Sequence, residues 1–131
     1  MPSPAGTGAF LKINAKRQPA VGKVLIGILR QRQWQTHLDK IPSSYPKDAA
    51  QIAADFKNAQ RTNLAVDMDE VNFGTCGIAS SFEANNGLRV ACSINGATVY
   101  FGGNRMEELA PVVKRLATEL KAPPKPAYGR P

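Results

Sequence analysis

The alternation of apolar and polar residues predicts two strands in the first third of the chain. Residues 9–14 (AFLKIN) show the two-residue period of a strand with one buried face. Residues 24–35 (VLIGILRQRQWQ) begin with an apolar run and end in polar residues, which is typical of a long strand that leaves the core partway along. Pro19 and Gly22 lie between these segments and are expected to interrupt regular structure, so that residues 15–23 form a basic loop.

Two later segments have the period of amphipathic helices. Residues 47–60 place alanines, Ile52 and Phe56 on one face, and they follow Pro46, which suits a first helical turn. A second helix is expected after Asn104, a preferred N-cap residue. Pro111 lies inside that segment and is expected either to kink the helix or to mark the start of its regular part.

The rest of the second half is predicted to be a β-meander. The pairs 86–87 and 95–96 are both Asn-Gly, the sequence that two-residue hairpin turns prefer, and both stand between short segments that alternate in polarity. With two-residue turns at both places, Cys92 would face Val99 on one side and Ser81 on the other. Cys76 would then lie too far from Cys92 for a disulfide, so we expect both thiols to be free.

These elements follow one another in the order β-β-α-β-β-β-α. They predict an α+β domain in which two helices pack on an antiparallel meander sheet. A single domain is expected over residues 9–121, because a chain of 131 residues suffices for one modest core. Residues 1–8 and 122–131 are rich in proline, glycine and alanine, and we expect them to be flexible tails.

Positive charge is concentrated in the first half of the chain. Residues 1–62 hold ten lysines and arginines against three aspartates, whereas the remaining residues hold seven charges of each sign. The whole net charge of +7 therefore lies in the N-terminal half, which predicts a polyanionic partner such as a nucleic acid.

The candidate nucleic-acid-binding residues follow from the strand predicted at 24–35. Successive residues of a strand point to opposite faces, so Arg30, Arg32 and Trp34 would share one face, where they could neutralise phosphates and stack on a base. The surface would extend over neighbouring basic or aromatic residues, namely Lys12, Lys16, Arg17, Lys23, Arg89 and Tyr100. Two alternatives remain open: Trp34 as a core residue covered by the last helix, and the arginines as charges that protect an edge strand from aggregation.

Two functions fit these features. The first is non-catalytic binding of single-stranded DNA or RNA with low sequence specificity, because the basic residues lie on predicted strands and loops and no recognition helix for duplex DNA is present. The second is a structural or accessory subunit of a larger assembly, such as a ribonucleoprotein or a virus-like particle, whose tails become ordered on assembly. Under both, the open edge of the meander and the modest helix stripe leave apolar surface for a second copy.

No catalytic, metal-binding or cofactor motif is recognisable in the sequence. His37 has no nucleophile in a recognisable setting nearby, and the acidic residues 67–70 (DMDE) are more typical of a solvated strand edge than of a cation site. One histidine and two unclustered cysteines are too few for structural zinc. The apolar run at 24–29 is too short for a membrane helix and the first residues lack a signal-peptide pattern, so we expect a cytoplasmic protein that is not an enzyme.

Overall fold

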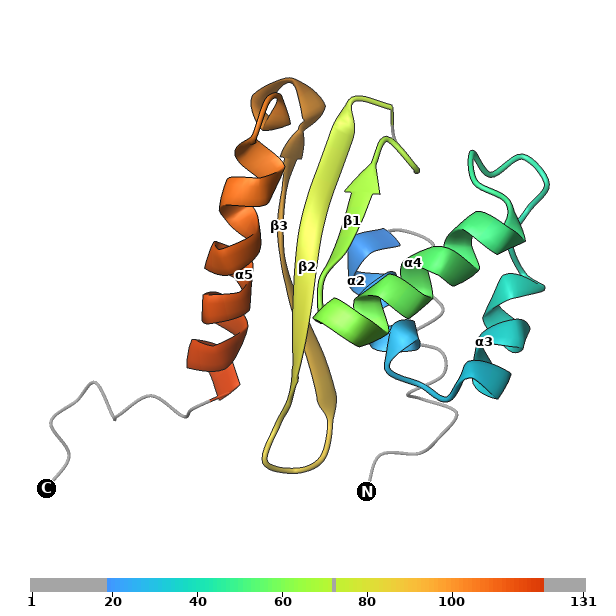
Figure 1. Cartoon of the computed structure of the whole chain (residues 1–131), viewed down its shortest axis with the longest axis horizontal. Coiled ribbons are helices and arrows are strands. Elements are labelled where there is room, and N and C mark those ends of the chain that lie inside the picture. The colour runs from blue at the N-terminus through green and yellow to red at the C-terminus, as the bar shows by residue number, and fades with distance from the viewer. Residues whose placement is uncertain (1–18, 72, 122–131) are drawn as a thin grey trace, which may run out of the picture.

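The computed structural model describes residues 19–71 and 73–121, which form an antiparallel three-stranded sheet flanked by helices (Figure 1). The strand order is β1 (Ala65–Met68), β2 (Thr75–Glu83) and β3 (Arg89–Ala97). Helix α5 (Arg105–Lys121) covers one face of the sheet. On the other face lies α2 (Pro19–Gly27), and α4 (Ala49–Thr62) packs across it. The short helix α3 (Gln31–Leu38) packs on the outside of α4.

Small side chains let α2 lie close to the sheet. Ala65, Ala79 and Ala91 sit on the same face of the three strands and pack against the apolar residues of α2. On the side away from the sheet, a Cβ atom at Gly27 would lie 2.7 Å from the carbonyl oxygen of Phe56, so only glycine fits where α2 crosses α4. As a result every residue of α2 is buried.

The strand predicted at residues 24–35 is wrong, because this segment forms the end of α2, a turn and most of α3. An apolar run without polar positions does not distinguish a buried strand from a buried helix, and α2 is buried all round. Pro19 does not interrupt structure either; it occupies the first position of α2, where its missing N–H costs nothing. Arg30 is the N-cap residue of α3, and its backbone N–H donates to the Gln33 side chain at 3.1 Å.

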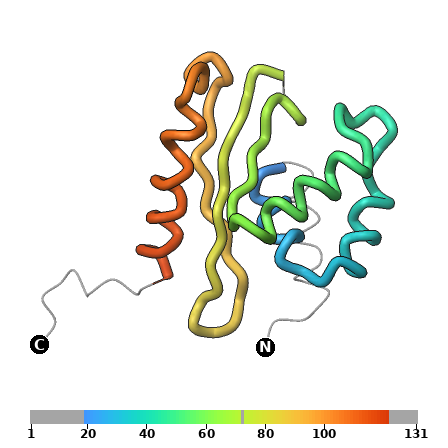
Figure 2. The backbone as a smooth tube through the Cα atoms, viewed as in Figure 1, coloured from blue at the N-terminus to red at the C-terminus, as the bar shows by residue number. Residues whose placement is uncertain are grey.

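One of the two predicted Asn-Gly turns, at 86–87, is present, but it lies within a five-residue connection and is not a two-residue turn. Residues 84–88 connect β2 to β3, and Gly87 there has a φ of 85°, a left-handed value that favours glycine (Figure 2). The predicted turn at 95–96 is wrong, because both residues continue β3 and pair with β2. Gly96 lies under the ring of Phe101, where a Cβ would come within 2.9 Å of the ring, so packing rather than a turn requires this glycine.

The chain reverses instead at the 3₁₀ helix η1 (Thr98–Phe101), where a further strand was predicted. The register of β2 and β3 also differs from the prediction, because the connection at 84–88 has five residues and not two: Cys92 faces Ser80, not Ser81. The prediction that Cys76 and Cys92 are free thiols is confirmed.

Both predicted helices of the later segments are present as α4 and α5. Asp48 caps α4, since its carboxylate accepts from the Gln51 backbone N–H at 2.8 Å while the Gln51 side chain accepts from the Asp48 N–H at 2.9 Å. Pro111 lies inside α5. The α+β class with an antiparallel sheet is thus confirmed, although helices precede the strands where β-β-α was predicted. The strand predicted at 9–14 and both predicted tails lie outside the described residues.

No helix among residues 19–71 and 73–121 combines the length and the apolar character that crossing a membrane requires.

Candidate ligand-binding site

A cavity of about 690 Å³ opens on the side of α2 that faces away from the sheet. It lies between α2, the end of α3 and the segment that follows it, the middle of α4, and the segment that follows β1. Most of its wall is apolar or neutral, formed by Pro19, Gly22, Ile26, Ile41, Pro42, Ser44, Tyr45, Pro46, Ile52, Phe56 and Val71. Its volume falls within the range of about 300–1,000 Å³ that is usual for small-molecule sites.

A buried lysine of α2 contributes to the wall of the cavity. Lys23 is only 3% exposed, yet its ammonium group makes three short contacts. It donates to Glu70 Oε2 at 2.6 Å and to the backbone oxygen of Val66 at 2.9 Å, and it lies 2.9 Å from Asp55 Oδ2. Three acceptors satisfy the three N–H donors of an ammonium group, which is the condition for burying the charge.

Two further residues complete what we term the Lys23 ion-pair network, formed by Lys23, Tyr45, Lys47, Asp55 and Glu70. The Lys47 ammonium lies 2.8 Å from Asp55 Oδ2 and 3.5 Å from Glu70 Oε2. The Tyr45 hydroxyl donates to Glu70 Oε1 at 3.0 Å. The network thereby links α2, the loop before α4, α4 itself and the segment after β1, with two positive and two negative charges.

The network shifts the acid–base properties of its members. Burial raises the pKa of the Asp55 carboxyl, but hydrogen bonds from Lys47 and Lys23 outweigh that effect and hold its pKa below the ordinary value. For Lys47 burial lowers the pKa, and the bond to Asp55 together with the charge of Glu70 raises it overall. Burial and the adjacent Glu70 charge raise the pKa of Tyr45, so its hydroxyl remains a hydrogen-bond donor.

Asp67 holds the backbone that carries Glu70. Its Oδ1 accepts from the Glu70 backbone N–H at 3.0 Å. The carboxyl group is buried on the α2 side of the sheet, opposite Gly77 of β2. Burial raises the pKa of Asp67, although the hydrogen bond from Glu70 acts in the opposite direction. The acidic segment 67–70 therefore has a structural part in the site rather than forming a solvated edge.

Lys40 and His37 belong to the lining of the cavity but not to the Lys23 ion-pair network. Lys40 is exposed, whereas His37 is half-buried. Burial, and secondarily the charge of Lys40, lowers the pKa of His37, so its imidazole is neutral at pH 7. In the described part of the chain, no three His, Cys, Asp or Glu side chains are grouped so that they could hold a metal ion.

The residues predicted to form one nucleic-acid-binding face lie in different environments. Lys23, expected in a basic loop, is instead buried among acids. Trp34, which could have been exposed or core, is 6% exposed and packs edge-on against Phe56 with ring centroids 5.6 Å apart. Its indole Nε1 is buried without a hydrogen-bond partner. Arg30 and Arg32 are exposed at the start of α3.

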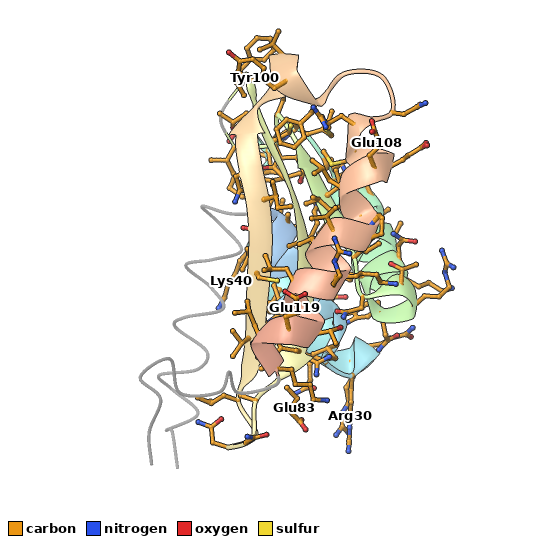
Figure 3. The ribbon with its side chains drawn as sticks, turned by 90° about the vertical axis from the view of Figure 1, so that its left-hand side faces the viewer. Arg30, Lys40, Glu83, Tyr100, Glu108 and Glu119 are labelled. Atoms are coloured by element: carbon orange, nitrogen blue, oxygen red, sulfur yellow. The ribbon has the colours of Figure 1, made fainter. Side chains whose placement is uncertain are left out.

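The remaining predicted residues are not brought to these arginines. Tyr100 is 75% exposed in η1, at the opposite end of the molecule from Arg30 (Figure 3). Arg89 begins β3 and is half-buried, and burial lowers the pKa of its guanidinium. Lys12, Lys16 and Arg17 lie outside the described residues. The prediction that Arg30, Arg32 and Trp34 share one face of a strand is therefore wrong, because α3 is a helix in which Trp34 points inward.

The sequence analysis missed Tyr45, Lys47 and Asp55, and it assigned Glu70 to a solvated strand edge. They come from segments that no local motif connects, and only the tertiary structure brings them together. One observation pointed toward them: a single lysine, Lys23, stands within the otherwise uncharged segment 18–29, where a buried cation needs an acidic partner.

Comparison with known proteins relates the fold to bacterial regulators. No family model matches the sequence, and none of the curated proteins searched matches it. Among solved structures, IclR from Thermotoga maritima superposes with a TM-score of 0.65 at 21% identity, over 78% of this chain and 44% of that one. The C-terminal domain of the E. coli transcriptional regulator KdgR has a TM-score of 0.62 at 18% identity, over 78% of this chain and 66% of that domain.

A third similar structure contains a small molecule. It is the inducer-binding domain of a double mutant of the PobR transcription factor from Acinetobacter, in complex with 3-hydroxybenzoic acid. Its TM-score is 0.66 at 17% identity, over 79% of this chain and 63% of that domain. The chain shares the fold of these regulator domains. It spans less than two thirds of the length of each of these solved chains.

Proposed function

We propose that this chain is a small-molecule-binding domain that serves a transcriptional regulator and catalyses no reaction. The observation that carries the proposal is the cavity beside α2, whose apolar wall is joined to a partly buried and fully paired set of charges. Such a network fixes the walls of a site in advance, so that binding costs little ordering of the protein. The shared fold with an inducer-binding domain supports the same assignment.

The lining favours a small organic anion with an apolar body. Lys23 and Glu70 neutralise each other, so the charge available to a ligand is that of Lys40. The neutral His37 imidazole can supply one further hydrogen bond. Aliphatic and aromatic side chains such as Ile52 and Phe56 would contact the rest of the molecule. A monocarboxylate with a small ring or a short aliphatic chain meets both conditions.

Thermal unfolding in the presence of aromatic and aliphatic monocarboxylates tests the proposal. A ligand that binds only the folded state raises the Tm, and the stabilisation grows with the logarithm of its concentration relative to Kd. The substitution Ser44→Trp fills the cavity from its lining and should abolish the shift, whereas Ser43→Trp, which changes an exposed residue outside the lining, should not. Lys40→Ala should weaken binding by about tenfold, with Lys57→Ala as its control. If no carboxylate raises the Tm, or if Ser44→Trp leaves the shift intact, the proposal is wrong.

A second candidate function is nucleic-acid binding, favoured by the exposed Arg30 and Arg32 and by the net charge of +7. The proposed target is single-stranded DNA or RNA with low sequence specificity, bound by the free chain or within a larger assembly. Titration of a homopolymer at several salt concentrations tests it, because removing a side chain that binds a phosphate reduces the slope of log K against log salt by about one. The double variant Arg30→Ala/Arg32→Ala should reduce that slope, and Arg115→Ala should not. A chain that binds no homopolymer at low salt excludes this function.

A further inference from the structure

Two neighbouring residues after β1 bond to two different parts of the molecule. Glu70 belongs to the Lys23 ion-pair network, where its carboxylate accepts from Lys23 and from the Tyr45 hydroxyl. Asp69 bonds instead to η1, because its Oδ1 accepts from the Thr98 hydroxyl at 2.7 Å. The connection after β1 and η1 lie at the same end of the sheet (Figure 1). A single peptide unit therefore separates the wall of the cavity from η1.

The backbone of Asp69 has a conformation that its hydrogen bonds must maintain. Its φ of 58° lies in the left-handed region, which is unfavourable for a residue with a Cβ atom. The Gly74 N–H donates to Asp69 Oδ1 at 2.7 Å, and the Asp69 N–H donates to the backbone oxygen of Thr75 at 2.9 Å. The Thr98 N–H in turn donates to the backbone oxygen of Gly74 at 2.7 Å. A strained backbone held in this way has a second, relaxed arrangement once those bonds are lost.

We propose that Asp69 and Glu70 form a switch that links the Lys23 ion-pair network to η1. While Glu70 keeps its partners, the peptide between the two residues is fixed, and Asp69 stays left-handed and bonded to Thr98. When Glu70 loses a partner and shifts, that planar peptide rotates as a unit and changes the backbone of Asp69. The bonds from Thr98 and Gly74 to Asp69 then break, and η1 is released.

Release of η1 changes the surface of the molecule at this end. The side chains of Val99 and Tyr100 in η1 are 80% and 75% exposed. Their position in the solvent follows the conformation of the short helix that carries them. The state of the Lys23 ion-pair network thereby alters an apolar part of the surface that does not belong to the cavity.

The effect of a ligand on this switch rests on the proposed function. Tyr45 and Glu70 both line the cavity, and the Tyr45 hydroxyl donates to Glu70 at 3.0 Å. The carboxylate of a ligand is the same kind of acceptor as that of Glu70, so it competes for this hydroxyl. Its negative charge also repels Glu70. An anion in the cavity therefore favours the relaxed state of the switch, whereas a neutral molecule of the same shape does not.

Hydrogen exchange of the Gly74 and Thr98 amides in the full chain tests the link without a ligand. Both amides donate bonds that hold the switch. Tyr45→Phe removes only the hydroxyl that reaches Glu70. It should raise both exchange rates about tenfold relative to the amide of Ala79, a fully buried residue of the central strand β2.

Two comparisons make this test specific. Tyr100→Phe removes a hydroxyl from η1 itself, two residues from Thr98, and should leave both exchange rates unchanged. Coupling between two sites is reciprocal, so Thr98→Val should accelerate exchange of the Tyr45 amide, which donates to the backbone oxygen of Pro42 at 3.0 Å. Thr118→Val removes a hydroxyl that bonds within α5, and it should not affect the Tyr45 amide.

Benzoate tests the part that depends on a ligand. Added to the unmodified chain, it should raise the Tm and accelerate exchange of the Gly74 and Thr98 amides, whereas the uncharged benzyl alcohol should not accelerate them. If Tyr45→Phe leaves both rates unchanged, or if Tyr100→Phe raises them as much, the switch is wrong whether or not a carboxylate binds. If benzoate raises the Tm without changing either rate, its effect on the switch is disproved and the proposed function stands. If no monocarboxylate raises the Tm, the proposed function fails, and the variants alone decide the link.

Discussion

Replacing Lys23 with methionine should reveal how much the buried ion pairs contribute to folding. Methionine fills a similar volume but leaves Glu70, whose side chain is 2% exposed, without its closest cation. Removing one partner of a buried pair costs about 3–5 kcal/mol. Lys47 stays 3.5 Å from Glu70, and the Tyr45 hydroxyl still donates to it, so we expect a loss at the lower end, about 3 kcal/mol of the free energy of unfolding.

Urea denaturation followed by circular dichroism measures this loss, and a double-mutant cycle separates the pair from its surroundings. Glu70→Gln keeps an acceptor for Tyr45 and removes the charge that Lys23 neutralises. The double variant Lys23→Met/Glu70→Gln should therefore be more stable than Lys23→Met alone, with a coupling of at least about 1.5 kcal/mol. Lys57→Met on the exposed side of α4 should change stability by less than about 0.5 kcal/mol. Additive single effects, or a Lys23→Met loss below about 1 kcal/mol, would refute the reasoning.

Three other predictions test further features of the fold. Burial raises the pKa of Asp67 above its ordinary 3.8, so the charged carboxylate destabilises the folded state at neutral pH. Asp67→Asn should therefore raise the urea midpoint at pH 7. This gain should vanish below pH 4, where the carboxyl group is protonated in both the folded and the unfolded state. Asn63 has a φ of 56° and makes three side-chain hydrogen bonds to Ser81. Asn63→Ala should lower the free energy of unfolding by about 3 kcal/mol, and Asn63→Gly, which accepts the left-handed backbone, by about 1 kcal/mol less. Equal losses for the two variants would disprove the backbone contribution. The fluorescence of Trp34 should be blue-shifted and insensitive to iodide, and strong iodide quenching would show that it is exposed.

The parts of the fold that the sequence predicts correctly are those that local chemistry determines. Helix α4 has a capping residue, a narrow apolar stripe and a helix-favouring composition within one segment. The turn at 86–87 needs a residue that accepts a left-handed backbone conformation, and Gly87 supplies it. The identical pair at 95–96 is misleading because both residues pair with β2, and the ring of Phe101 packs on Gly96. A tertiary contact thus overrides the same local preference.

The candidate site could not be predicted because its parts carry no local pattern. The apolar sequence of residues 24–29 is compatible with a buried strand and with a buried helix. Only the tertiary structure, in which α2 is buried on all sides, distinguishes the two. Because residues at every second position share a face in a strand but not in a helix, the alternation of Arg30, Arg32 and Trp34 does not indicate a common surface. The cavity then arises from how α2, α4 and the intervening loop pack, and its acidic residues are up to 47 positions away from Lys23.

The complete burial of α2 also bears on how the chain folds. A nine-residue helix is too short to be stable in isolation, and this one has no polar face with which to meet water. It can therefore persist only when the sheet and α4 enclose it from both sides. The two layers must come together in one cooperative step, since a half-assembled intermediate would expose α2 and leave its single lysine without countercharges.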